Sequence, residues 1–251
     1  MGRFPCLPPE LIALIVDHLH GDSTALKACS LVSHTFLPLA QAHLFENIEL
    51  RFRSNANIEP MRRGLIPVLS HTRKLSISYS IVFIVPSILD GIIDHFMAFR
   101  NVRELKICLD TFHFVDRDLR TTSRYFSQFQ PTLRSLDLTT FDRYPKDTIA
   151  FITFFSFLEE LSLLFCYVGP GAARGGRMKV LDPNSLTPLR GTLRIRDTSS
   201  DDEFIAELTK VRVLYDTLEL GGDTLSPGTG ISGLFAACAP TLRIIRFLHN
   251  C

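Results

Sequence analysis

The chain has 251 residues, enough for one elongated domain or two compact ones. Hydrophobic residues make up 46%, as in ordinary globular proteins, and the net charge of +1 argues against a chain-wide electrostatic partner such as duplex DNA. Six cysteines without a CxxC pair, no Asn-X-Ser/Thr sequon and no N-terminal signal segment favour reduced core cysteines and a cytoplasmic or nuclear location.

The first predicted helix begins at Pro8 and Pro9, where proline is tolerated, and extends to about Leu19. With 100° between successive residues, its apolar side chains cover about 200° of the circumference. A stripe of about 100° is enough to pack on a single core. The helix therefore has two apolar faces to bury.

Two further short helices follow. Gly21 ends the first helix, Asp22 and Ser23 can cap a second helix over residues 24–33, and a third extends from about Phe36 to Leu44. Three helices of this length enclose too small a core to be stable alone. We therefore expect them to dock on a permanent partner or on the rest of the chain.

This segment resembles the F-box, in particular the F-box proteins of basidiomycete fungi. The matching residues are Leu7-Pro8-Pro9-Glu10-Leu11, Ile15, His18-Leu19-His20, Leu26-Lys27-Ala28-Cys29-Ser30-Leu31-Val32-Ser33, Leu37-Pro38, His43-Leu44-Phe45 and Ile48-Glu49-Leu50. This chain has His34-Thr35-Phe36 where the family usually has a basic residue and a tryptophan. The resemblance implies a three-helix F-box over residues 1–46.

F-box segments bind the Skp-type adaptor of cullin-based ubiquitin ligases, and the resemblance implies the same partners here. One face of the first helix would pack within the trio, and the other would fill an apolar groove on the adaptor. The side chains expected at that contact are Leu7, Pro8, Leu11, Ile12, Ile15, Leu19, Leu26, Cys29, Val32 and Phe36. The alternative is that all of them form the core of a small helical cap.

A short apolar-x-apolar motif recurs every 25 to 32 residues after the helices. Its instances are Ile48-Glu49-Leu50, Leu75-Ser76-Ile77, Leu105-Lys106-Ile107, Leu136-Asp137-Leu138, Leu161-Ser162-Leu163, Leu193-Arg194-Ile195, Leu218-Glu219-Leu220 and Ile245-Arg246-Phe247. The clearest stretches of helical length between them are residues 87–99, 148–160, 202–211 and 230–240. One strand and one helix per repeat is typical of a leucine-rich repeat solenoid.

The predicted fold class is therefore α/β: an N-terminal three-helix F-box, then a right-handed leucine-rich-repeat-like solenoid over residues 47–251 with a parallel sheet on its concave face. The last motif ends four residues before Cys251, and an open solenoid end normally needs a polar cap. We expect the solenoid to be incomplete there, because the chain is a fragment or truncated product, or the end to be frayed or dimeric.

The central residue of every motif is polar, which distinguishes the solenoid from a doubly wound sheet with two apolar faces. The charged central residues alternate in sign, which favours a protein target over nucleic acid. The expected target contacts are Lys106, Asp137, Arg194, Glu219 and Arg246. A merely solvated face is the alternative.

Signs of catalysis, cofactors, metals or membranes are weak. The loop Gly169–Gly176 fits neither GxGxxG nor a P-loop, and His18 and His20 are two apart on a helix, which suits a metal pair poorly. The apolar stretch Leu75–Leu89 is too short to span a membrane. We expect a binding subunit of a Skp/cullin/F-box ubiquitin ligase with no active site, cofactor or metal. The alternatives are a leucine-rich-repeat scaffold outside any ligase, or an enzyme using the glycine-rich loop.

Overall fold

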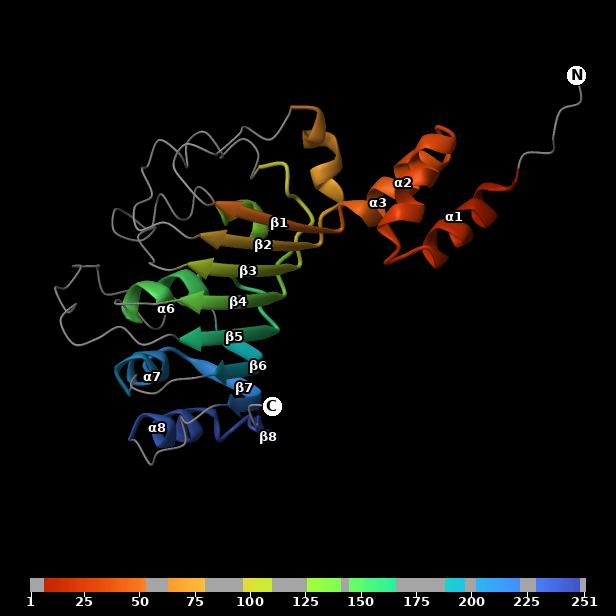
Figure 1. Ribbon diagram of the computed structural model, residues 1–251. Coiled ribbons are helices and arrows are strands. Elements are labelled where there is room, and N and C mark those ends of the chain that lie inside the picture. Colours follow the sequence, from red (N-terminus) through yellow and green to blue (C-terminus); the bar gives the residue numbers. More distant parts are fainter. Residues whose placement is uncertain are drawn as a thin grey trace, which may run out of the picture.

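The computed structural model describes residues 7–52, 63–79, 97–109, 126–140, 145–165, 188–196, 202–221 and 229–248. Figure 1 shows three N-terminal helices beside one end of a sheet whose strands are stacked in chain order. The expected α/β architecture, with three N-terminal helices before a parallel sheet, is confirmed.

The three helices, here called the helical unit, are α1 (Pro9–His18), α2 (Ser23–Val32) and α3 (Phe36–Leu44). The carboxylate of Asp22 caps α2 as expected, because its Oδ1 accepts hydrogen bonds from the backbone N–H groups of Thr24 (3.0 Å) and Ala25 (2.9 Å). Both α1 and α2 pack on α3. Their shared core is small: Val16, Leu26 and Ala40, with Leu19, Cys29, Phe36, Leu39 and Leu44 packed around it.

Eight parallel strands form one sheet in the order β1 to β8, and each contains one of the eight predicted motifs. Their bounds are β1 Asn47–Phe52, β2 Lys74–Tyr79, β3 Glu104–Leu109, β4 Ser135–Thr140, β5 Glu160–Phe165, β6 Leu189–Arg196, β7 Val213–Gly221 and β8 Ile244–Leu248. The motifs are in register, so that Leu75 pairs with Leu105 and Leu105 with Leu136, and the pairing continues from Ile48 to Ile245.

One face of the sheet is buried, and the other faces the solvent. The two apolar residues of each inner motif are buried in one continuous core, which also contains Phe151, Phe204 and Leu234 from the helical side. Successive strand side chains point to opposite faces, so the polar central residues share the other face. This alternation confirms the arrangement expected from the motifs.

Helices and 3-10 turns connect the strands on the apolar side: η1 (Arg63–His71), η3 (Ser127–Phe129), α6 (Pro145–Thr153), α7 (Asp202–Thr209) and α8 (Thr229–Cys238). The helix expected over residues 148–160 is shorter than predicted, because Glu159 and Glu160 donate backbone N–H bonds to the carbonyl of Arg134 and lead into β5. Residues 87–96 of another expected helix lie outside the described residues.

A backbone hydrogen-bond pattern joins each repeat to the next. The Glu46 carbonyl, just after α3, accepts from the N–H groups of Arg73 (2.9 Å) and Lys74 (3.0 Å). The carbonyls of Arg73, Arg103 and Arg134 do the same for the following repeat. The helical unit is thus joined to the first step of this ladder, and the Thr72 hydroxyl adds a 2.9 Å bond to the Phe45 carbonyl.

The last strand differs from the inner ones. Ile244, Ile245 and Phe247 of β8 are exposed, whereas the corresponding residues of β7, Leu218 and Leu220, are buried. The described residues leave 43%, 45% and 55% of these three residues exposed.

Gly191 lies at an irregularity in β6, where the pairing with β7 shifts between Gly191 and Thr192. Its φ is +83°, and a Cβ there would clash with the carbonyl oxygen of Glu159. Gly21 also has a positive φ, +94°, but a Cβ there would have no neighbouring atom of the described residues within 4 Å, so it would meet open space.

We predict that Gly191→Ala lowers the free energy of unfolding by about 2–5 kcal/mol, because backbone strain and a steric clash act together. Gly21→Ala is the matched control and should cost only about 1–2 kcal/mol, from its backbone conformation alone. Urea denaturation measures the free energy of unfolding of both variants. Equal losses of stability would mean that the clash with Glu159 contributes nothing beyond the backbone strain.

Candidate functional site

Helix α1 has two apolar faces. Ile12 and Val16 are buried on the face toward the other helices. On the other face, Leu11, Leu14 and Ile15 are 46%, 54% and 43% exposed. Figure 1 shows α1 on the side of the helical unit away from the sheet, where no other described element packs on it. The structure thus leaves one apolar face of this helix uncovered.

The end of α2 adds more apolar surface. Leu31 is 86% and Val32 is 69% exposed, although leucine and valine are among the residues most often buried. We call six residues of the helical unit the exposed apolar set: Leu7, Leu11, Leu14, Ile15, Leu31 and Val32. Such a concentration on a few turns of helix is typical of an interaction site.

The structure divides the ten residues expected at the adaptor contact into two groups. Five are exposed: Leu7, Pro8, Leu11, Ile15 and Val32. Of the other five, Ile12 is buried, Leu26 belongs to the small core, and Leu19, Cys29 and Phe36 pack against that core.

Leu14 and Leu31 are exposed apolar residues that the sequence analysis did not include. Leu14 could have been found, because it lies one turn from Leu11 on the same arc of the helix. Leu31 could not, because its exposure depends on how α2 packs on α3.

The second candidate surface is the polar face of the sheet. A groove of about 770 Å³ extends over β1 to β6, and its lining includes Lys106, Asp137 and Arg194. Charges of both signs lie along it: Lys74 pairs with Glu104 at 2.9 Å, and Lys106 approaches Asp137 at 3.6 Å. The groove therefore has no uniform charge, unlike a nucleic-acid site.

Glu219 was expected to contact a target, but the structure places it differently. Its side chain is only 7% exposed and its carboxylate is held between two arginines. Arg194 Nε donates to one oxygen at 2.5 Å and Arg246 Nη1 to the other at 2.8 Å. Because its two oxygens are already bonded, Glu219 holds neighbouring strands together and is little available to a ligand.

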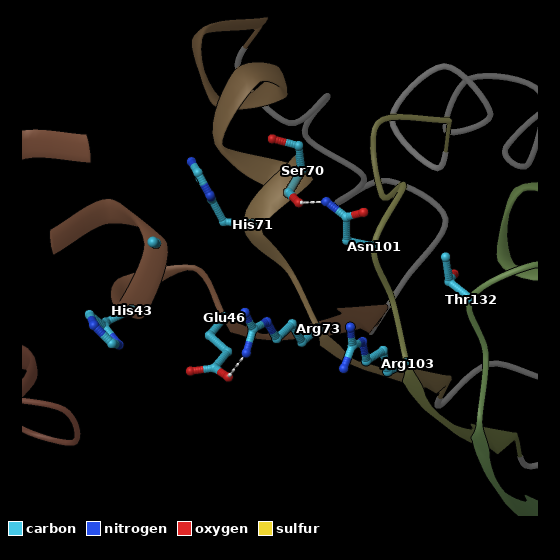
Figure 2. A pocket seen from close by; sticks show the side chains of 9 residues that line it. His43, Glu46, Ser70, His71, Arg73, Asn101, Arg103 and Thr132 are labelled. Carbon is cyan, nitrogen blue, oxygen red and sulfur yellow. Dashed lines mark hydrogen bonds and ion pairs between the residues drawn. The ribbon is translucent and has the colours of Figure 1, made fainter. Parts of the chain in front are cut away.

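A third hollow lies where the helical unit meets the repeats. It has a volume of about 270 Å³, and its lining includes His43, Glu46, Arg73 and Arg103. Figure 2 shows His43 and Glu46 on the helical side and the two arginines on the strand side. Glu46 Oε1 lies 3.8 Å from Arg73 Nη1.

The glycine-rich loop and three of the six cysteines lie outside the described part of the chain. The loop Gly169–Gly176 is not described, and neither are Cys6, Cys166 and Cys251. The three described cysteines, Cys29, Cys108 and Cys238, are not in disulfides.

A scan against models of known protein families gives no match, and a search of curated proteins finds no significant similarity. Within the described ranges, no helix is both long and apolar enough to cross a membrane.

The pairing of Glu219 yields a prediction about stability and pH. The hydrogen bond from Arg194, followed by that from Arg246, holds the pKa of Glu219 below its usual 4.5, against the opposing effect of burial. A carboxylate with a lowered pKa stabilises the folded chain above its unfolded pKa, and this contribution disappears as the pH falls through the folded value.

We predict that Glu219→Gln lowers the free energy of unfolding at pH 7 by about 1–3 kcal/mol. The difference from the wild type should shrink as the pH falls below 4.5. Glu104→Gln, which removes an exposed ion pair, is the control and should cost less than about 1 kcal/mol. Chemical denaturation at several pH values measures this, and a difference that does not vary with pH would contradict the assignment.

Proposed function

We propose that this chain is the substrate-recognition subunit of a Skp/cullin/F-box ubiquitin ligase. The helical unit would be an F-box that binds a Skp-type adaptor and, through it, cullin. The repeats would be of the leucine-rich type and would hold a protein target on the polar face of the sheet. The observation that carries the proposal is the uncovered apolar face of α1 at Leu11, Leu14 and Ile15.

The face of α1 suits a helix-in-groove contact. An amphipathic helix binds an apolar groove through residues spaced three and four apart, and Leu11, Leu14 and Ile15 have this spacing. Full burial of a leucine or isoleucine side chain contributes about 1.5–3 kcal/mol, and half-exposed side chains would contribute about half of that each. The exposed apolar set therefore supplies enough surface for a specific contact.

Several residues of the helical unit that match the F-box pattern are also exposed. Leu7, Pro8, Leu11 and Ile15 match the F-box pattern and are exposed. Leu26 also matches it and lies in the small core. Ile12 is buried on α1, and Phe36, which stands where the family usually has tryptophan, packs against that core. We propose that these three residues shape the helical unit without touching the adaptor.

The polar face of the sheet supports the second half of the proposal. The strands present side chains of both signs along a groove of about 770 Å³, and Lys106 and Asp137 are partly exposed there. Complementary charges of both signs select a protein partner and fix its orientation. The partner would be a protein, and we propose no nucleic-acid or membrane contact.

The proposed function is binding without catalysis. Holding a target near a charged ubiquitin carrier raises its effective concentration, and the chemistry takes place on other subunits. No cofactor or metal takes part in this role. Such ligases act in the cytoplasm and the nucleus, which are the compartments proposed for this chain.

The alternative function is a leucine-rich-repeat scaffold outside any ligase, with the helical unit as a cap. One observation favours it: α3 contacts η1, and Phe45 and Glu46 accept hydrogen bonds from the first repeat. A cap, however, does not account for the exposed face of α1, which is turned away from the repeats.

We predict that Ile15→Asp in the full chain reduces affinity for a Skp-type adaptor at least about 30-fold, because a charge would enter an apolar groove. Met97→Asp is the matched control: Met97 is 46% exposed, close to the 43% of Ile15, and lies in the repeat region. Calorimetric titration with purified adaptor measures both affinities.

Binding of the wild type that Ile15→Asp leaves unchanged would place the adaptor contact elsewhere. No binding of the wild type would leave the scaffold as the better function. Circular dichroism checks that both variants remain folded.

A second prediction concerns the polar sheet face. The double variant Lys106→Asp with Asp137→Lys exchanges the two charges while keeping them opposite, so stability should change by less than about 1 kcal/mol. We expect it to lose the proteins that the wild type enriches in affinity purification with mass spectrometry, yet to retain the adaptor. An unchanged set of enriched proteins would exclude this part of the groove as the target site.

A further inference from the structure

Three potential metal ligands from separate parts of the helical unit meet at one point. His20 lies in the turn after α1, His43 is in the last turn of α3, and Glu46 follows α3. One ligand atom from each lies within 4.8 Å of the others. The sequence gives no local signal for this combination, because His20 and His43 are far apart in the chain.

The distances are close to those of a tetrahedral metal site. His20 Nδ1 lies 3.2 Å from His43 Nδ1 and 3.7 Å from Glu46 Oε2. With metal–nitrogen distances of 2.0–2.1 Å, ligand atoms in a tetrahedral zinc site are about 3.3–3.4 Å apart. The ligand atoms of His43 and Glu46 also lie within 4.8 Å of each other, and the 58% exposed side chain of His20 has room to move toward both.

The hydrogen bond between His43 and Asp17 leaves the other ring nitrogen of His43 for a metal. His43 Nε2 lies 2.8 Å from Asp17 Oδ1, and a carboxylate only accepts, so the proton is on Nε2. Nδ1 then presents its lone pair toward His20 and Glu46. In zinc sites, a ligating histidine usually donates its other ring N–H to a carboxylate. That hydrogen bond orients the ring and raises its basicity.

We propose that His20, His43 and Glu46 form a zinc-binding site that ties the turn after α1 to the end of α3. Two imidazole nitrogens and one carboxylate oxygen suit Zn²⁺ and not Mg²⁺ or Ca²⁺, which prefer all-oxygen sets. His20 binds through Nδ1 with its proton on the solvent side of the ring, at Nε2. A water molecule from the adjoining 270 Å³ hollow, which His43 and Glu46 also line, takes the fourth position.

The two oxygens of Glu46 divide between two partners. Oε2 faces His20, while Oε1 faces Arg73, as the dashed line in Figure 2 shows. Arg73 begins the link to β2, since its backbone N–H donates to the Glu46 carbonyl. The metal therefore strengthens the junction between the helical unit and the first repeats, and the site is independent of the adaptor contact.

The test uses the chain of 251 residues without a histidine tag, stripped of metal and titrated with Zn²⁺ in a calorimeter. We expect one saturable Zn²⁺ site, and filling it should raise the melting temperature of the chain. His20→Ala should lower the affinity for Zn²⁺ by tenfold or more. Asp17→Asn should weaken it by about tenfold as well. His18→Ala is the matched control, since the Nδ1 of His18 is bonded to the Leu14 carbonyl and lies outside the cluster.

Two results would overturn the proposal: no saturable Zn²⁺ binding by the wild type, or equal Zn²⁺ affinity in the wild type and His20→Ala. The six cysteines are present in every variant, so zinc held by thiols would persist in His20→Ala and be recognised as such. His20→Ala removes an exposed side chain, so its fold should survive even where His43→Ala is unstable.

Discussion

Each repeat of this chain can bury its apolar residues only against the repeats before and after it. The register from Ile48 to Ile245 follows from this constraint, because a shift of one residue would turn every buried leucine to the solvent. The carbonyl ladder through Glu46, Arg73, Arg103 and Arg134 repeats the same spacing in the backbone. Stacking of this kind places one polar row along the whole sheet, and an exposed apolar edge at β8.

The helical unit is under the opposite constraint, since it has too few buried residues to form a large core of its own. Only Val16, Leu26 and Ala40 are at its centre, whereas Leu11, Leu14 and Ile15 are left outside. Its remaining links are polar: the Phe45 and Glu46 carbonyls bind the first repeat, and the His20, His43 and Glu46 cluster joins two of its turns. A protein partner on α1 and a metal ion in the cluster would stabilise different sides of the same small unit.

The polar row on the sheet contains two differently placed groups of charged side chains. Toward β8, Arg194, Glu219 and Arg246 satisfy one another and connect three strands. Toward the middle, Lys106 and Asp137 are 3.6 Å apart and partly exposed, so their contact is weak and both side chains are accessible from the groove. The groove over β1 to β6 is thus the more available half of the surface.

The positions of the eight strands and of α1 to α3 could be read from the sequence, because alternation of apolar and polar residues, capping by Asp22 and the break at Gly21 are local signals. The polarity of the sheet face followed for the same reason, from the central residue of each motif. Two features depended on contacts between residues about 23 to 27 positions apart and had no local signal: the pairing of Glu219 with two arginines, and the meeting of His20 with His43. Which face of α1 is uncovered also depended on packing, because it is set by how α1 lies on α3. The local sequence pattern determined the helices, the strands and their buried faces. Only the tertiary structure decided which side chains of different elements contact each other.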